Sequence, residues 1–365
     1  MPLIFILLLV SYLLGNTYIF VRGIHSLGHL SLLSRGIFSS VYWICTVLLF
    51  ISFMFRRSGQ SSYQFGHTLF LIGSGWLVFT LYMAVFLACM DLIKVFNKSF
   101  SYGFFVALSL TVCMLIYGYI NYQHPSKQVF NIFINKPLID KDKLKIVAIS
   151  DLHLGLGTDI KLLSRNIDRI NAESPDLILI GGDLIDNSVE PVAAMKMETE
   201  LNRLNAPMGI YMSPGNHEYI SGIKACTNYI SKTKIQFLID SLVGLPCGLQ
   251  IVGRDDLSNR KRLSVGDWTS LTDKGKPIIV IDHQPVNLDE AQRIGADLQF
   301  SGHTHYGQII PLNWLTNYLF DIAYGYEKRN DTNYYVSSGL ALWGPPFRIG
   351  TNSEFVVFNC SFSDL

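Results

Sequence analysis

Charged residues are scarce in the first third of this chain. Of its 365 residues, 29 are Lys or Arg and 28 are Asp or Glu. Residues 1–123 contain only seven of these, namely Arg22, Arg35, Arg56, Arg57, Asp91, Lys94 and Lys98. The remainder carries 23 basic and 27 acidic side chains. The apolar composition excludes a wholly disordered chain. The lack of a basic excess excludes a strongly basic nucleic-acid-binding protein, so no nucleic-acid partner is indicated.

Cysteines are also few, and none lies in a Cys-x-x-Cys pair. The six are Cys45, Cys89, Cys113, Cys226, Cys247 and Cys360. The first three fall in the apolar part, which leaves an odd number scattered through the rest. This distribution argues against a disulfide framework or a zinc ribbon and fits a reducing compartment. The chain also lacks internal repeats and low-complexity tracts.

The first third consists instead of four long uncharged stretches. They are Pro2–Val21, Gly36–Phe55, Thr68–Met90 and Ser99–Gln123. Each reaches the roughly 20 residues that a helix needs to cross about 30 Å of hydrocarbon. The first lacks a charged n-region and a cleavage site, so we interpret it as an uncleaved span rather than a signal peptide. The sequence therefore predicts an integral, multi-pass membrane domain of four transmembrane helices over residues 1–123.

The loops between these spans carry little chemistry. His25 and His29 are spaced i, i+4 and could hold a metal or haem on a helix, but we favour two interfacial side chains. No predicted span contains an ionisable residue of the kind that marks a membrane-embedded pathway, which argues against a transporter.

Basic residues accumulate after the fourth span. They are Lys127, Lys136, Lys141, Lys143 and Lys145. With four spans, the basic loop at 56–57 shares one side of the membrane with both termini. The positive-inside rule then predicts that residues 124–365 are cytoplasmic.

The remaining residues have the pattern of an α/β domain. Residues 124–144 read as a linker and an edge strand, in which the apolar run Val129–Ile134 is ended by Pro137. Short apolar runs predict strands at Lys145–Ile149, Leu177–Ile180, Ile210–Met212, Leu249–Val252, Ile278–Ile281, Leu298–Phe300, Tyr334–Val336 and Phe355–Phe358. Helical spacing predicts helices over Asp159–Ala172 and Val189–Leu204. We expect layered sheets flanked by helices in one domain over residues 145–365.

Five of these strands are followed at once by Asp, His or Asn in a short loop. The segments are I-S-D-L-H at 149–153, G-G-D-L-I-D at 181–186, P-G-N-H-E at 214–218, D-H-Q-P at 282–285 and S-G-H-T-H at 301–305. All the histidines after residue 124 lie in these loops. Ligands typically bind where loops leave the carboxyl ends of sheet strands.

These loops supply a candidate metal-ligand set. Its members are Asp151, His153, Asp183, Asn216, His283, His303 and His305. Nitrogen and oxygen ligands without thiolate suit Mn, Fe or Zn. Seven ligands are too many for one tetrahedral ion. They predict two divalent metal ions that share a bridging carboxylate, a geometry used for displacement at phosphorus.

The order of these motifs closely resembles the calcineurin-like metallophosphoesterase superfamily, over roughly residues 144–360. The tail S-S-G-L-A-L-W-G-P-P-F-R-I-G at 337–350 is similar to a membrane-associated branch. That branch includes bacterial phosphodiesterases of the UDP-diacylglucosamine pyrophosphatase kind and a eukaryotic transmembrane protein with a metallophosphoesterase domain. The resemblance implies a two-sheet β-sandwich flanked by helices, with a dinuclear metal centre at one edge.

The resemblance also implies roles for individual residues. One ion would be held by Asp151, His153, Asp183 and His305, and the other by Asp183, Asn216, His283 and His303. Asp183 is then the bridge, and His217 is left without a metal. We assign His217 and Asn216 as catalytic residues, with His217 contacting the scissile phosphate and protonating the leaving oxygen. An imidazole titrates near neutrality and can act as a general acid.

Five neighbouring residues have two interpretations each. Asp186 either orients a ligand or caps a helix. Arg254, Asp255 and Asp256 either contact substrate or form a solvated turn, and we favour the turn. Arg348 either binds a phosphate in bidentate geometry or braces its loop.

The sequence thus predicts a membrane-anchored, metal-dependent phosphoesterase that hydrolyses phosphodiester or pyrophosphate bonds. Its phosphate-containing substrates would be amphipathic or lipid-linked and presented at the bilayer. One alternative keeps the chemistry but takes soluble nucleotides or phosphoproteins. Another is a non-catalytic membrane sensor with a degenerate esterase domain, against which the intact ligand set argues. The sequence carries no signal for an oligomeric state.

Overall fold

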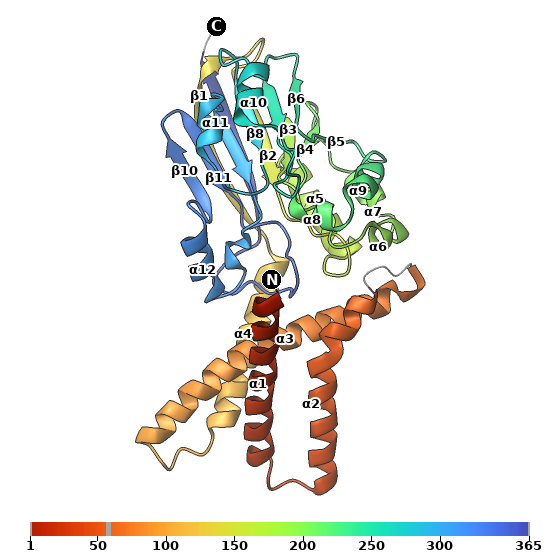
Figure 1. Cartoon of the computed structure of the whole chain (residues 1–365), viewed down its shortest axis with the longest axis vertical. Helices are drawn as coiled ribbons and strands as arrows, with labels where there is room; N and C mark the ends of the chain where they lie inside the picture. Colours follow the sequence, from red (N-terminus) through yellow and green to blue (C-terminus); the bar gives the residue numbers. More distant parts are fainter. Residues whose placement is uncertain (1, 56–59, 364–365) are drawn as a thin grey trace. The chain divides into compact units, whose positions relative to one another are not determined.

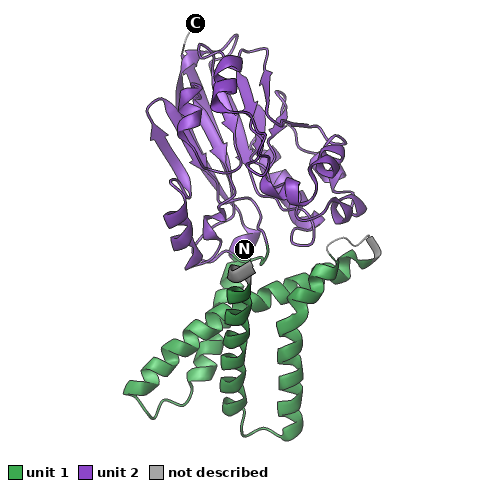
Figure 2. Ribbon diagram, viewed as in Figure 1, with its two compact units in different colours: residues 1–55, 61–120, 344–347 green, residues 56–60, 121–343, 348–365 purple. Residues whose placement is uncertain are grey.

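A computed structural model describes residues 2–55 and 60–363, which fall mainly into two compact units (Figure 2). One contains residues up to 55, residues 61–120 and the short segment 344–347. The other contains residues 121–343 and 348–363. The second unit holds all five of the polar loops that the sequence singles out.

Four long helices make up most of the first unit (Figure 1). They are α1 (Pro2–Ser26), α2 (Leu32–Ser52, followed by a 3-10 turn at Phe53–Phe55), α3 (Gln60–Phe96) and α4 (Gly103–Gln123). Each contains a segment long and apolar enough to cross a membrane. The prediction of four long apolar helices is therefore confirmed.

The helix ends differ from the predicted spans, and α1 and α3 include charged residues. In particular, α1 continues past Val21, and α3 has 37 residues. Arg22 on α1 forms an ion pair with Asp91 on α3 at 2.5 Å. The hydroxyl of Tyr18 donates a hydrogen bond to the same carboxylate at 2.6 Å. The basic loop at 56–57 lies outside the described residues.

His25 and His29 do not form a helical pair. Because α1 ends at Ser26, only His25 belongs to the helix, and both side chains are exposed. The i, i+4 geometry that a metal or haem would need is absent between these two residues, so the interfacial interpretation is the one that fits.

A buried amide lies at the centre of the helical unit. The side-chain oxygen of Asn16 accepts hydrogen bonds from Tyr42 (3.1 Å), Thr46 (3.2 Å), Trp76 (3.0 Å) and Thr80 (3.3 Å). These partners lie on α2 and α3, so one neutral side chain joins three helices. Among apolar helices such shared hydrogen bonds select which surfaces pack together.

The second unit is a sandwich of two six-stranded sheets (Figure 1). The first sheet has the order β1 (Ser126–Pro137), β12 (Glu354–Ser363), β2 (Lys143–Ile149), β3 (Leu177–Ile180), β4 (Ile210–Met212), β5 (Ile235–Phe237). The second has the order β10 (Gly325–Arg329), β11 (Thr332–Val336), β9 (Leu298–Ser301), β8 (Ile278–Ile281), β7 (Gln250–Gly253), β6 (Ser241–Gly244). Strands β2 to β5 are parallel, as are β7, β8, β9 and β11.

Alternating side chains build the layers of the sandwich. In β8, Ile279 and Ile281 belong to the core between the two sheets. Ile278 and Val280 belong to a second core, together with Trp268 of α10 (Val265–Leu271). This is the period of two that a strand buried on both faces requires. The predicted two-sheet α/β fold is confirmed.

The prediction of one continuous helix over Val189–Leu204 is wrong. The structure has two short helices, α6 (Val189–Ala194) and α7 (Met197–Leu201). Lys196 between them is left-handed, with φ of 51°. The break lets Val192 on α6 and Met197 on α7 both be buried, although their spacing of five residues does not share one helical face.

Several short elements were not predicted. They are β5, β6, β10, α8 (Asn216–Ile220), α9 (Ile223–Ile230), α10, α11 (Asp289–Arg293), a 3-10 turn η2 (His305–Gly307) and α12 (Leu312–Leu319). The predicted helix at Asp159–Ala172 is present as α5 (Ile160–Ala172). It begins where the carboxylate of Asp159 accepts a hydrogen bond from the Leu162 amide at 2.8 Å.

Candidate metal centre

The loops that leave β2, β3, β4, β8 and β9 converge, and they bring the predicted ligands together. Asp151, His153 and His305 form one group, and Asp183, His283 and His303 form another. Within each group, one potential ligand atom per residue lies within 4.8 Å of the others. Asp151, His153 and Asp183 follow parallel strands of the first sheet, and His283, His303 and His305 follow parallel strands of the second. Ligands typically bind outside such carboxyl ends.

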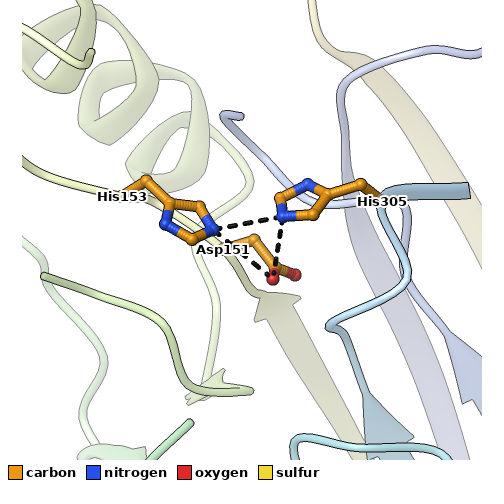
Figure 3. A group of neighbouring side chains, drawn as sticks. All are labelled: Asp151, His153 and His305. Carbon is orange, nitrogen blue, oxygen red and sulfur yellow. Dashed lines mark hydrogen bonds and ion pairs between the residues drawn. The ribbon is translucent and has the colours of Figure 1, made fainter. Parts of the chain in front are cut away.

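The first group has its ligand atoms facing one another (Figure 3). The Nε2 atoms of His153 and His305 are 3.1 Å apart. The Oδ1 atom of Asp151 lies 3.8 Å from the first nitrogen and 3.5 Å from the second. Three buried or nearly buried side chains from the loops after β2 and β9 thus converge on one point.

The second group includes an amide oxygen. Oδ1 of Asn216 lies 3.2 Å from Nε2 of His283 and 2.9 Å from Nδ1 of His303. Oδ2 of Asp183 lies 3.2 Å from Nε2 of His283 and 3.7 Å from Nε2 of His153. Asp183 is therefore within reach of both groups.

The backbone at these residues is unusual, because five candidate ligands adopt left-handed conformations. They are Asp151 (φ 56°), His153 (44°), Asp183 (52°), His303 (72°) and His305 (47°). Such conformations are uncommon outside glycine and cluster at functional sites. Glycines make room for the carboxylates: a Cβ on Gly215 would lie 2.2 Å from Oδ1 of Asp183, and one on Gly302 2.4 Å from Oδ2 of Asp151.

The protonation of the imidazoles follows their surroundings. Burial, reinforced by His283, lowers the pKa of His303 to about 4. Burial and the neighbouring His153 hold the pKa of His305 well below its usual value. Both rings are therefore neutral at pH 7, which is the form that binds metal. Although burial opposes it, His283 lowers the pKa of Asp183, which stays a carboxylate. Although burial opposes it, Asp183 and Asp151 raise the pKa of His283 well above its usual value. The imidazoles, carboxylates and amide oxygen of this set are the ligand types that suit Mn, Fe or Zn.

His217 lies beside the first group and is oriented by Asp186. Its Nδ1 is 2.8 Å from Oδ1 of Asp186, and the same oxygen is 3.7 Å from Nδ1 of His153. Burial opposes ionisation of Asp186, but its contacts with His153 and His217 lower its pKa to about 2. The N-cap of helix α6 is Ser188, so Asp186 does not cap that helix. Of its two predicted roles, the one that fits is the positioning of imidazoles.

Distance alone allows two roles for His217. It forms a third compact group with His153 and Asp183, again within 4.8 Å. It could therefore be a ligand or a free acid, and the two roles give different results on mutation.

Glu218 is a functional residue that sequence reasoning missed. Its buried carboxylate accepts four backbone hydrogen bonds, from the amides of Gly215 (2.7 Å), Asp183 (2.9 Å), Leu184 (2.8 Å) and Ile185 (3.1 Å). It thereby ties the loop after β3 to the loop after β4. The sequence could have indicated this role, because Glu218 lies three residues after Gly215, which is the spacing of a capping box.

We expect Glu218→Gln to lower both stability and metal content. An amide nitrogen would face amide donors in place of an acceptor, and each buried group left unsatisfied costs about 1–3 kcal/mol. Thermal unfolding and elemental analysis measure the two effects. Asp267→Asn makes the same change in the exposed capping box of α10 and should have little effect. A Glu218→Gln protein with normal melting and full metal would disprove this role.

The segment after β7 is not the solvated turn that the sequence suggested. Arg254, Asp255 and Asp256 are all buried. Arg254 pairs with Glu290, and Asp255 accepts a hydrogen bond from the Tyr219 hydroxyl at 2.6 Å. These groups form an internal polar network that supports the loops of the site.

Arg348 braces its loop. Its buried guanidinium donates to the carbonyl oxygens of His305 (2.7 Å), Gly339 (3.2 Å) and Ala341 (3.2 Å), and also to that of Ser338. These contacts use the guanidinium N–H groups that would bind a phosphate in bidentate geometry. Of the two predicted roles of Arg348, the one that fits is therefore the bracing of its loop.

Comparisons with known proteins agree with this geometry. The family described as "Calcineurin-like phosphoesterase" matches residues 144–307. An "uncharacterized metallophosphoesterase" of Campylobacter jejuni is 30% identical over 97% of both chains. Another from Helicobacter pylori is 34% identical over 61% of this chain and 60% of that protein. The "transmembrane protein with metallophosphoesterase domain" of Danio rerio is 30% identical over 68% of this chain and 60% of that protein.

Clustered His and Asp side chains at the strand ends of a two-sheet sandwich define a metal-dependent hydrolase of phosphate esters. The chain belongs to the calcineurin-like metallophosphoesterases, and the resemblance seen in its motifs is confirmed. It is a metal-dependent phosphoesterase with four long apolar helices before the catalytic domain.

Proposed function

We propose that this protein is a membrane-anchored phosphoesterase that cleaves phosphodiester or pyrophosphate bonds at a centre of two divalent ions. The observation that carries the proposal is the position of Asp183. Its Oδ2 is 3.7 Å from a nitrogen of the first group and 3.2 Å from a nitrogen of the second. One carboxylate can thus serve both groups, as a bridging ligand must. Asp151, His153 and His305 would complete the first ion site, and Asn216, His283 and His303 the second.

The chain's own residues would bind the phosphate and assist the leaving group. When bound, the two ions supply Lewis-acid stabilisation of charge at phosphorus. Asp186 engages Nδ1 of His217, which leaves Nε2 to hold a proton for the leaving oxygen. The amide oxygen of Asn216, which lies against His283 and His303, would bind an ion and so hold the neighbouring His217 in position. The exposed ring of Trp343, 6.2 Å from the ring of His217, offers an apolar wall beside it.

The four apolar helices support anchoring in a bilayer and, with it, lipid-linked substrates. Soluble nucleotides or phosphoproteins would need the same centre but not this anchor. A degenerate sensor would be expected to have lost a ligand or its oriented histidine, and this chain keeps all of them.

The test is hydrolysis by the full-length protein purified in detergent. A diester, a monoester and a lipid pyrophosphate are assayed with Mn, Fe and Zn in turn. We expect turnover of a diester or pyrophosphate that chelation abolishes and one of these metals restores. If the protein binds two ions yet hydrolyses none of these substrates, nor a nucleotide or a phosphoprotein, it is a sensor.

We further propose that the catalytic domain is cytoplasmic. Five lysines soon after α4 motivate this, but Lys127 and Lys136 pair with Glu173 and Asp297 within the folded domain. Orientation therefore needs a direct measurement. A cysteine at exposed Lys274 should react with an impermeant maleimide only after cells are permeabilised. A cysteine at exposed His29, in the loop before α2, should react in intact cells. The reverse pattern, with the unsubstituted chain as background, would place the domain outside.

A further inference from the structure

Helix α12 and the residues before it present a large exposed apolar surface on the catalytic unit. This α12 surface consists of Ile310, Leu312, Trp314, Leu315, Tyr318 and Leu319. Trp314 is 69% exposed and Tyr318 is 86% exposed. Residues 306–320 contain no Asp, Glu, Lys or Arg. A contiguous apolar patch of this kind marks an interaction site rather than ordinary surface.

The helix that carries this surface (Figure 1) packs closely against the loop after β9. Asn313 is buried, and a Cβ on Gly307 would lie only 2.3 Å from its backbone nitrogen. Phe320, at the end of α12, has its ring 5.9 Å from that of His303. The exposed side chains are therefore carried by a helix whose C-terminal end contacts the site.

We propose that the α12 surface docks on the lipid bilayer. Trp and Tyr are enriched at membrane–water interfaces, and Trp and Leu are typical of the face that an interfacial helix buries in the bilayer. The catalytic unit also begins at residue 121, within the last turn of the apolar helix α4. The side-chain amide of Asn121 donates to the carbonyl oxygens of Arg348 (3.1 Å) and Thr351 (2.8 Å). If α4 crosses the bilayer, the catalytic unit follows the membrane-spanning part of the chain directly in the sequence.

Docking on the bilayer indicates which class of substrate the centre takes. This inference about the substrate rests on the proposed phosphoesterase function. The centre would work at the level of lipid head groups, on an amphipathic phosphodiester or pyrophosphate whose tail stays in the bilayer. A cavity of about 350 Å³ lies between the end of α12 and the loop after His283. Its lining includes the apolar Leu319, Phe320, Pro285 and Val286 and the charged Asp289, Asp321 and Arg329. The apolar side chains would contact the part of the lipid next to the phosphate.

The first test measures contact with lipid and does not depend on activity. Full-length protein is reconstituted in neutral phosphatidylcholine vesicles, with or without bromine on the upper acyl chains. The fluorescence difference between the native chain and Trp314→Phe isolates Trp314. We expect bromine to quench this component, and high salt to leave the quenching unchanged because the surface is uncharged. An unquenched Trp314 would overturn the proposal. So would Tyr318→Cys chains that crosslink to one another when the native chain does not, since a second copy would then cover α12.

The second test compares two substrates of one variant. In Leu315→Glu/Tyr318→Glu, the ratio of hydrolysis of a vesicle-borne lipid phosphodiester to that of a soluble diester should fall about tenfold or more, given the apolar burial lost. Leu271→Glu changes an equally exposed leucine on α10 and should leave the ratio unchanged. An unchanged ratio in the double variant would overturn the substrate class. If the native chain hydrolyses neither diester, the proposed function fails, while the quenching result still decides the docking.

Discussion

Replacing Asp183 by Asn should nearly abolish hydrolysis and release metal from both groups. Asparagine has the same shape, and its oxygen can still accept the hydrogen bond that Oδ1 takes from the His217 amide at 2.8 Å. The second oxygen, which faces both His153 and His283, becomes an amide nitrogen that cannot ligate. Because one group serves two ions, we expect a loss on the order of 10³-fold or more in kcat/KM. Elemental analysis should find less than two ions per chain.

Asp186→Asn is the matched control. It makes the same change next to His153 and His217 without removing a proposed ligand, and loss of such a supporting contact typically costs about 10–100-fold. Melting temperatures of both variants show whether the fold is intact. A folded Asp183→Asn protein that keeps two ions and near-normal turnover would rule out the shared carboxylate, and with it the dinuclear proposal.

Local patterns were enough to predict the central strands. The buried strands β3, β4 and β8 begin and end at the predicted residues, because each is a continuous apolar run. Edge strand β10 was missed, since Gly325–Arg329 is mostly polar and is a strand only by pairing with β11. The ion pair of Arg22 on α1 with Asp91 on α3 was missed for a related reason. It joins two residues that are far apart in the sequence.

In the site, too, the parts set by local sequence could be predicted and the parts set by tertiary contacts could not. Its five loops could be predicted, because each polar cluster follows directly on its own strand. Their supports could not be predicted, because they depend on contacts made only in the folded chain. Glu218 binds amides of another loop, and Arg348 binds the carbonyl oxygen of His305. Asp186 had to be seen beside His217 before its role could be separated from helix capping.

His217→Ala should slow hydrolysis and leave both ions bound. The proposal gives His217 no metal, and its Nδ1 is engaged by Asp186. Loss of general acid–base assistance typically costs about 10²–10⁴-fold, and we expect a loss in that range. The variant also leaves Asp186 with one imidazole partner fewer, so melting temperatures should accompany the rates.

The dependence on the leaving group then identifies what His217 does. If it protonates the leaving oxygen, the loss should be large for an alkoxide and small for a nitrophenolate, which scarcely needs a proton. If the loss is equal for the two, His217 acts mainly by binding the phosphate. If His217→Ala instead loses a metal ion, then the compact group with His153 and Asp183 is a real ligand set, and the proposed division of ligands between the two ions is wrong. Metal content measured alongside rates on both leaving groups distinguishes these three outcomes, because proton donation alone predicts full metal content together with a loss that depends on the leaving group.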